Sequence, residues 1–257
     1  MFENYIQELE QSITQKENLK LIRSISQEFV RDHSLTDCWN FSLEAWQSPY
    51  FQVQELSVFI CGYTGHQNKE AIQFLENEVI QHPDWRVQEV LAMAFDTYCN
   101  TIGYEQAIPI IKKWLCSCND RQRRAVTEGL RVWTSRNYFK ENPQIAIKLL
   151  ANLHADESEY VRKSVGNALR DISKKFPDLV IRHTFATRCF EKKMEPKVVQ
   201  KLMGHSSISI TMNIYTHVLE NKMNEEIQKF GSANTEQTNP YADLNIPKRT
   251  ITAMSHC

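Results

Sequence analysis

The sequence predicts an all-α protein built as a solenoid of paired helices, and three observations support this. Only seven of the 257 residues are glycine, whereas barrels and sandwiches need many tight turns. Apolar residues recur at helical spacing from the N-terminus to about residue 180. Similar stretches of sequence return at intervals of about 35 to 39 residues, which suits repeats made of two packed helices.

The first helical segment is expected from Tyr5 to Ile25. Its leucines and isoleucines lie at roughly the spacing of one buried helix face. They are Ile6, Leu9, Ile13, Leu19, Leu21 and Ile22. No stretch of alternating apolar and polar residues predicts a strand.

A repeat follows this segment, and its four aligned stretches begin at Phe51, Trp85, Asp120 and Glu159. Each comes directly after residues that start helices well, as N-cap side chains or first-turn prolines. These starts are Ser48-Pro49, His82-Pro83-Asp84, Asn119-Asp120 and Asp156-Glu157-Ser158. Connecting helices are expected at residues 70–80, 104–114 and 142–153. Stacked helix pairs of this kind form a HEAT-like or armadillo-like solenoid with a concave face.

The repeat pattern breaks after Pro177-Asp178-Leu179-Val180, so residues 1–180 are predicted as one domain. Residues 181–230 are a second segment, with a turn at 204–207 between two helices. Residues 231–257 are polar, rich in turn-forming residues and lack a periodic apolar face. This composition predicts a disordered tail.

Charge is distributed unevenly along the chain, although the formal net charge is only −1. Between Ile111 and Lys140 only Asp120 and Glu128 oppose a run of basic residues. These are Lys112, Lys113, Arg121, Arg123, Arg124, Arg131, Arg136 and Lys140. A local basic stripe can bind phosphate even when the whole chain is neutral. We therefore predict double-stranded DNA as a partner, with a solvated helix face as the alternative interpretation of the stripe.

The remaining composition indicates a reduced, cytoplasmic protein without metal or cofactor. The seven cysteines are odd in number and form no CxxC pair, so neither a disulfide framework nor a zinc site is indicated. The N-terminus lacks the basic and apolar regions of a signal peptide. No apolar stretch is long enough for a membrane span. The oligomeric state is left open.

The repeat stretches carry distinctive residues. Residues 82–89 read HPDWRVQE, residues 123–131 read RRAVTEGLR, and residues 159–175 read EYVRKSVGNALRDISKK. On these stretches, residues 1–180 resemble the HEAT-like-repeat DNA alkylation repair family, the alkylpurine DNA glycosylases of the AlkC and AlkD type. The resemblance implies release of positively charged alkylated purines from DNA by a carboxylate and aromatic side chains on the concave face.

By this resemblance, Glu89 takes the place of the catalytic carboxylate and Trp85 that of a cleft aromatic. The two residues are four apart, so one helix face presents both. A carboxylate stabilises the oxocarbenium-like charge of glycosidic bond cleavage, and an indole face attracts a cationic base or sugar. The resemblance also makes Arg123 a phosphate contact. Further phosphate contacts are expected from Arg124, Arg131, Arg162 and Lys163.

The sequence departs from AlkD-like members at three places. Glu89 stands where they commonly carry aspartate, so its reach differs by one methylene. Asn167 stands where they carry a second cleft tryptophan. Only a short link joins Arg31 to Asp37, where relatives have an aromatic and basic helical segment.

A second set of motifs lies in residues 181–230. Residues 181–188 read IRHTFATR, residues 198–211 read VVQKLMGHSSISIT, and residues 215–218 read YTHV. They resemble the end of a tyrosine recombinase (phage integrase) catalytic domain. The resemblance implies that Tyr215 is the nucleophile that attacks phosphate, with Arg182 and His205 stabilising the charge. Leu179 replaces an expected histidine, and helical repeat replaces the upstream catalytic region, so this end is expected to be truncated and inactive.

Together these patterns predict an all-α HEAT-like solenoid with an appended recombinase-derived helical segment. The expected function is DNA binding of the alkylation-repair type, with base excision through Glu89 and Trp85. Two alternatives stay open: a degenerate DNA integration or recombination protein, and a non-catalytic HEAT scaffold that binds protein partners. Convergence of Trp85, Glu89 and Arg123 on one concave face would favour DNA, whereas Glu89 on the convex surface would favour the scaffold.

Overall fold

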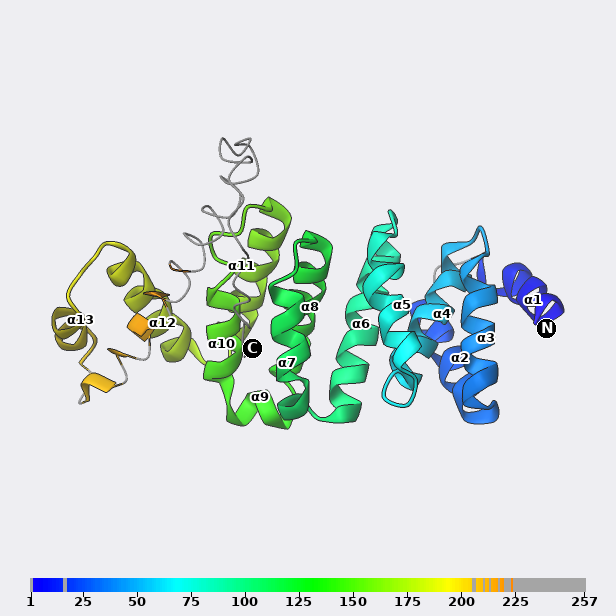
Figure 1. Ribbon diagram of the computed structural model, residues 1–257, viewed down its shortest axis with the longest axis horizontal. Helices are drawn as coiled ribbons and strands as arrows, with labels where there is room; N and C mark the ends of the chain where they lie inside the picture. The colour runs from blue at the N-terminus through cyan, green and yellow to red at the C-terminus, as the bar shows by residue number, and fades with distance from the viewer. Residues whose placement is uncertain are drawn as a thin grey trace, which may run out of the picture. The chain divides into compact units, whose positions relative to one another are not determined.

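The computed structural model describes residues 2–15, 18–204, 207–209, 211–212, 214–216, 218–219 and 223, and within these ranges the chain is helical with no strand (Figure 1). The helices are α1 (Glu3–Ile13), α2 (Leu19–Asp32), α3 (Leu35–Trp46), α4 (Phe51–Thr64), α5 (Lys69–Asn77), α6 (Trp85–Ile102), α7 (Tyr104–Leu115), α8 (Asp120–Trp133), α9 (Asn137–Glu141), α10 (Pro143–Ala151), α11 (Glu159–Ser173), α12 (Pro177–Glu191) and α13 (Pro196–Met203), with a 3-10 turn η1 (Val79–Gln81). The all-α prediction is confirmed.

The chain divides into two compact units, with the boundary inside α12 between Phe185 and Ala186. In the first unit, α4, α6, α8 and α11 pack one against the next. These are the helices that begin at the four aligned stretches of the repeat. We call them the inner helices. Helices α3, α5, α7 and α10 each pack against an inner helix, which gives the paired-helix arrangement that the repeat predicted.

Capping residues set where several helices begin. The carboxylate of Asp84 accepts a hydrogen bond from the Arg86 backbone N–H at 2.9 Å, at the start of α6. The Asn18 side chain does the same for the Leu21 N–H at 3.1 Å, at the start of α2. This cap explains why the segment from Tyr5 to Ile25 is not one continuous helix. The predicted apolar residues are shared by two helices: Ile6, Leu9, Ile13 and Ile22 are buried in the same core, whereas Leu19 and Leu21 are exposed.

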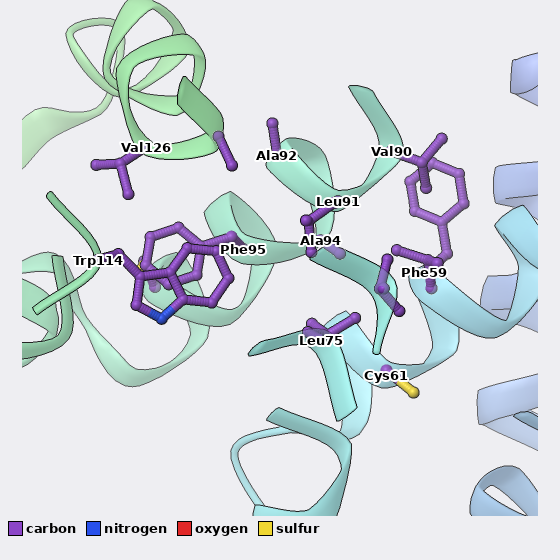
Figure 2. Close-up of a cluster of buried hydrophobic side chains, with 14 of the residues drawn as sticks. Phe59, Cys61, Leu75, Val90, Leu91, Ala92, Ala94, Phe95, Trp114 and Val126 are labelled. Atoms are coloured by element: carbon purple, nitrogen blue, oxygen red, sulfur yellow. The ribbon is translucent and has the colours of Figure 1, made fainter. Parts of the chain in front are cut away.

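The core of the first unit runs along the inner helices. Phe95 of α6 and Trp114 of α7 lie face to face (Figure 2). Their ring centroids are 3.9 Å apart and their planes are 18° apart. Both rings are fully buried. The indole N–H of Trp114 donates to a carboxylate oxygen of Glu76 at 2.7 Å, so its one polar group is satisfied.

Helices α4 and α6 approach closely at Gly62. A Cβ atom at this position would lie 2.7 Å from the Cα of Ala94, which is closer than any real contact. Glycine therefore lets the two inner helices pack backbone against backbone, and this close approach holds the middle of α6 next to α4.

The described part of the second unit has a small core of its own. It consists of Ala186, Cys189, Phe190, Val199 and Val218, with partly buried side chains around it. Helix α13 ends at Gly204, whose φ of 65° lies in the left-handed region that favours glycine at a helix end. The predicted turn at 204–207 thus begins where expected. The predicted disordered tail at 231–257 lies outside the described residues.

Among the described residues, no helix combines the length and apolar character that crossing a bilayer requires.

Candidate nucleic-acid interface

A cleft of about 650 Å³ lies along the inner helices of the first unit. Its walls come from α2, α6, α8, α11 and the turn between α8 and α9. The charged side chains that line it are Arg23, Glu89, Asp96, Glu128, Arg131, Arg136, Asp171, Lys174 and Lys175. The described lining contains no aromatic residue. The cleft is therefore a polar, charged surface rather than an apolar pocket.

Most of the carboxylates lie deeper in this cleft than the cations. The side chains of Asp96 and Glu128 are 10% and 13% exposed, whereas those of Arg136 and Lys174 are 41% and 68% exposed. A polyanion that approaches the cleft therefore meets cationic groups first. Glu89 is the exception, because its carboxylate side chain is 34% exposed, the highest value of the four acids.

A chain of alternating charges runs across α6, α8 and α11. Glu89 of α6 pairs with Arg124 of α8, which lies 3.9 Å from Glu128 one turn along the same helix. Glu128 accepts from Arg131 at 2.7 Å, and Arg131 also donates to Asp171 of α11 at 2.8 Å. Lys174 completes the chain with a 2.7 Å contact to Asp171. We call this set the ion-pair chain, and it fixes the orientation of Glu89 relative to α8 and α11.

The ion-pair chain also shifts the pKa of one carboxyl. Hydrogen bonds from Lys174 and Arg131 hold the pKa of Asp171 below its ordinary value. Deeper in the cleft the shift is in the other direction, since burial raises the pKa of Asp96. Asp96 accepts from the Tyr104 hydroxyl at 2.9 Å and from Arg136 at 3.1 Å, and these bonds oppose the effect of burial.

Arg124, the ion-pair partner of Glu89, lines a second, smaller hollow. It has a volume of about 170 Å³ and is lined by Pro83, Trp85, Gln88, Arg121, Arg124 and Tyr160. Gln88 is buried and donates to the backbone carbonyl of His82 at 2.9 Å, which ties the segment before α6 to its second turn. This bond and the Asp84 cap place Trp85 in the first turn of α6, with its indole 64% exposed. We call this feature the Trp85 hollow.

The two residues expected to act in base excision therefore lie one helical turn apart on α6. Glu89 lines the cleft, and Trp85 lines the Trp85 hollow. Arg124 lines the hollow and links it to the cleft, because its guanidinium pairs with Glu89 and lies 4.4 Å from the ring centroid of Tyr160.

Arg123 lines neither the cleft nor the Trp85 hollow. Its guanidinium is buried and makes paired hydrogen bonds to Asp156 at 2.7 and 2.8 Å, with further bonds to the backbone carbonyls of Ser117 and Cys118. All three partners lie in the loops that precede α8 and α11. Arg123 therefore holds two inter-helix loops together, and its guanidinium N–H groups are already used by protein acceptors.

The other expected phosphate contacts remain at the surface to differing degrees. Arg131 lines the cleft, and Arg124 is largely enclosed between Glu89 and Tyr160. Arg162 and Lys163 are exposed near the start of α11. Arg162 donates to the backbone carbonyls of Asp156 and Glu157, and Lys163 pairs with Glu159 at 2.8 Å.

The recombinase-like residues are spread over the chain's two units. Arg182 is exposed on the part of α12 that belongs to the first unit. Tyr215 belongs to the second unit, where its half-buried ring packs edge-on against Phe190 with centroids 5.1 Å apart. His205 lies outside the described residues.

The fold and the charged cleft define a helical-repeat protein with a polar, charged groove. A comparison of sequences identifies its family. The sequence profile of the DNA alkylation repair enzyme family matches residues 18–192, which is more than half of the chain. The protein therefore belongs to this family. The match begins at the start of α2 and extends to the end of α12.

Two solved structures resemble the chain over most of its length. The crystal structure of AlkD2 from Streptococcus mutans is 42% identical, with a TM-score of 0.69, and the match covers 80% of this chain and 99% of that one. The structure of smu.31 from Streptococcus mutans UA159 is 41% identical, with a TM-score of 0.66, and covers 84% and 98% of the two chains. The HEAT-like helical fold is thereby confirmed.

Tyrosine recombinases match the chain over 48 to 78 residues at the higher identities, and over longer stretches at 25–26% identity. A XerC-like tyrosine recombinase of Caldanaerobacter subterraneus is 50% identical over 48 residues, which is 19% of this chain and 12% of that protein. A different kind of relative, the uncharacterized protein YhaZ of Bacillus subtilis, is 40% identical over 83 residues, 31% of this chain and 23% of that protein. The chain spans less than half the length of each of these curated relatives, from 12% to 48%.

Several residues of the site did not emerge from the sequence. Glu128, Asp171, Lys174 and Tyr160 contribute to the cleft or to the Trp85 hollow. A signal for Tyr160 was present, because it occupies the second position of its aligned stretch, as Arg121 does in the preceding one. Residues at equal positions of neighbouring repeats lie on the same side of the solenoid, so these two side chains line one hollow.

Proposed function

We propose that the protein binds double-stranded DNA along the cleft of its inner helices. The observation that carries this proposal is the difference in exposure between the charges: the side chains of Arg131, Arg136 and Lys174 are 37–68% exposed, whereas those of Glu128, Asp96 and Asp171 are 10–24% exposed. Phosphate oxygens reach such cations without displacing the acids. Lysine and arginine contacts to phosphate supply most of the sequence-independent affinity for DNA.

The ion-pair chain suits this role. Arg131 is held by Glu128 and Asp171, so its guanidinium is already oriented before DNA arrives. Lys174 and Lys175 lie just beyond the end of α11, where both are exposed. Membership of a DNA alkylation repair family agrees with this surface being the DNA-facing one.

Base excision is the second function that we propose, and it rests on Glu89. Of the four carboxylates in the cleft it is the most exposed, and Arg124 fixes its position. Loss of an N-alkylated purine breaks the bond between C1′ of the deoxyribose and the base nitrogen, and the bonding electrons leave with the base. Glu89 would stabilise the positive charge that develops on the sugar and accept a proton from the water whose oxygen bonds to C1′.

DNA binding is tested by charge reversal at the mouth of the cleft. The double variant Lys174→Glu with Lys175→Glu is compared with Lys69→Glu with Lys112→Glu, which changes the net charge equally on exposed residues of α5 and α7. Anisotropy of a labelled duplex should show a tenfold or larger loss of affinity for the first variant only. Equal losses would mean that DNA responds to total charge and not to this cleft. Failure of the wild-type protein to bind duplex DNA would favour the protein-binding scaffold.

Excision is tested by release of N-methylated purines from duplex DNA. Glu89→Gln should abolish release while the protein still binds the duplex. Glu70→Gln, an exposed glutamate on α5, is the matched control and should leave release unchanged. Absence of release by the wild-type protein, at concentrations where it binds the duplex, would remove excision and leave DNA binding standing.

For the recombinase-like end we propose a packing role without strand cleavage. This is supported by the contact of Tyr215 with Phe190 and by its place beside the small core of the second unit. Tyr215→Phe should unfold at the same urea concentration as the wild-type protein. A covalent protein–DNA adduct that forms with the wild-type protein and disappears in this variant would contradict the proposal.

A further inference from the structure

The Trp85 hollow has a chemical character different from that of the cleft. Two aromatic side chains, Trp85 and Tyr160, and two guanidinium groups, those of Arg121 and Arg124, share a space of about 170 Å³. Among the described residues, Trp85 is the most exposed aromatic side chain, at 64%. An indole left in water at the rim of a hollow gains free energy when a flat, apolar surface covers it.

Both arginines of the hollow are held in place. Nη1 of Arg121 donates to the backbone carbonyls of Gln81 and His82 at 2.9 and 2.8 Å. Arg124 lies between Glu89 and the face of the Tyr160 ring. These contacts fix two guanidinium groups beside the aromatic rings before any ligand binds, so little conformational entropy is lost when an anionic group reaches them.

The two aromatic rings and two guanidinium groups of the hollow favour some parts of a DNA strand over others. Aromatic side chains stack on any unpaired base, and arginine binds its phosphate. The base of an intact pair is covered by its neighbours and offers no face to Trp85. A cationic alkylated base is repelled by the two guanidinium groups of the hollow. Glu89, the carboxylate that would attract such a base, lines the cleft and not the hollow.

We infer that the Trp85 hollow binds an unpaired, uncharged DNA base, which stacks on Trp85 and Tyr160 while Arg121 contacts the adjoining phosphate. This inference rests on the proposed DNA binding and adds a substrate feature to it. The protein then prefers duplex DNA that contains an unstacked nucleotide, and the hollow holds that nucleotide next to the cleft.

The experiment compares three labelled duplexes of the same sequence: one fully paired, one with a single unpaired thymine, and one with an unpaired abasic residue in its place. The wild-type protein should bind the thymine duplex about tenfold more tightly than the abasic one, within the range measured for stacking of one base on aromatic residues. Tyr160→Leu should bring this ratio close to one. Tyr160→Phe, which keeps the ring, should retain it.

Tyr50→Leu is the matched control, since Tyr50 and Tyr160 are both 45% exposed but Tyr50 lies outside the hollow. It should retain the ratio of the wild-type protein. A wild-type ratio of one, with normal binding to the paired duplex, would overturn the inference and leave the proposed DNA binding intact. Loss of binding to all three duplexes would overturn both. Tighter binding of an unpaired N7-methylguanine than of an unpaired guanine would contradict the selection against cationic bases.

Discussion

Arg123 offers a sharp test of the structure, because the sequence and the structure assign it different roles. Its guanidinium and the carboxylate of Asp156 are 7% and 5% exposed and share two hydrogen bonds. Replacement by methionine keeps much of the side-chain volume but leaves the Asp156 carboxylate buried without its cation. Removing one partner of a buried ion pair costs about 3 kcal/mol or more. In a domain of this size, that corresponds to a fall in Tm of about 6–12 °C.

The assay is urea unfolding followed by far-UV circular dichroism, beside duplex binding at fixed salt. Arg123→Met should lower the unfolding midpoint, whereas duplex affinity of the folded protein stays within twofold of the wild-type value. Arg31→Met is the control, because Arg31 and its partner Asp32 are both solvent-exposed. This variant should leave the midpoint unchanged. An Arg123→Met protein with unchanged stability and a tenfold loss of duplex affinity would refute the reasoning and restore the phosphate-contact role.

Two further predictions concern the inner helices. Gly62→Ala should destabilise the protein by about 1–3 kcal/mol in urea unfolding, because the new methyl group would force α4 away from Ala94. Gly166→Ala, on α11 where no atom lies within 4 Å, should instead stabilise it slightly, and equal effects would contradict the close approach of α4 and α6. Because the pKa of Asp171 is lowered in the folded state, its ion pairs stabilise the protein above the ordinary aspartate pKa of about 3.9, and this contribution is lost as the pH falls through the lowered value. The stability advantage of the wild-type protein over Asp171→Asn should therefore shrink between pH 7 and pH 3 in urea unfolding, and a constant difference would contradict it.

The sequence predicted the helical class and the repeat because both depend on local signals. The aligned stretches mark the first residues of α4, α6, α8 and α11, and the Asp84 cap sits where the sequence put a helix start. The break between α1 and α2 was not predicted, since Ile6, Leu9, Ile13 and Ile22 face one core although they belong to two helices. Periodicity shows which side of a helix is buried and not whether the helix is continuous.

The site was harder to predict, as Arg123 and Arg124 illustrate. Adjacent residues on a helix point about 100° apart, so one of these two arginines faces Asp156 and the other faces Glu89. Because the two side chains are chemically identical, the sequence does not indicate which arginine faces Asp156 and which faces Glu89. Asp171 lies 40 residues from Arg131 in sequence, and Asp96 lies 40 residues from Arg136. Each pair meets only because neighbouring repeats stack. Such contacts follow from tertiary packing and carry no local signal.

The salt dependence of duplex binding tests the central claim most directly. The logarithm of the association constant falls linearly with the logarithm of the salt concentration, with a slope of about 0.9 for each phosphate contact. If Lys174 and Lys175 each contact a phosphate at the mouth of the cleft, the Lys174→Gln, Lys175→Gln variant should show a slope smaller in magnitude by about 1.8. The Lys69→Gln, Lys112→Gln control should keep the slope of the wild-type protein. Equal slopes for all three proteins would contradict DNA binding in this cleft.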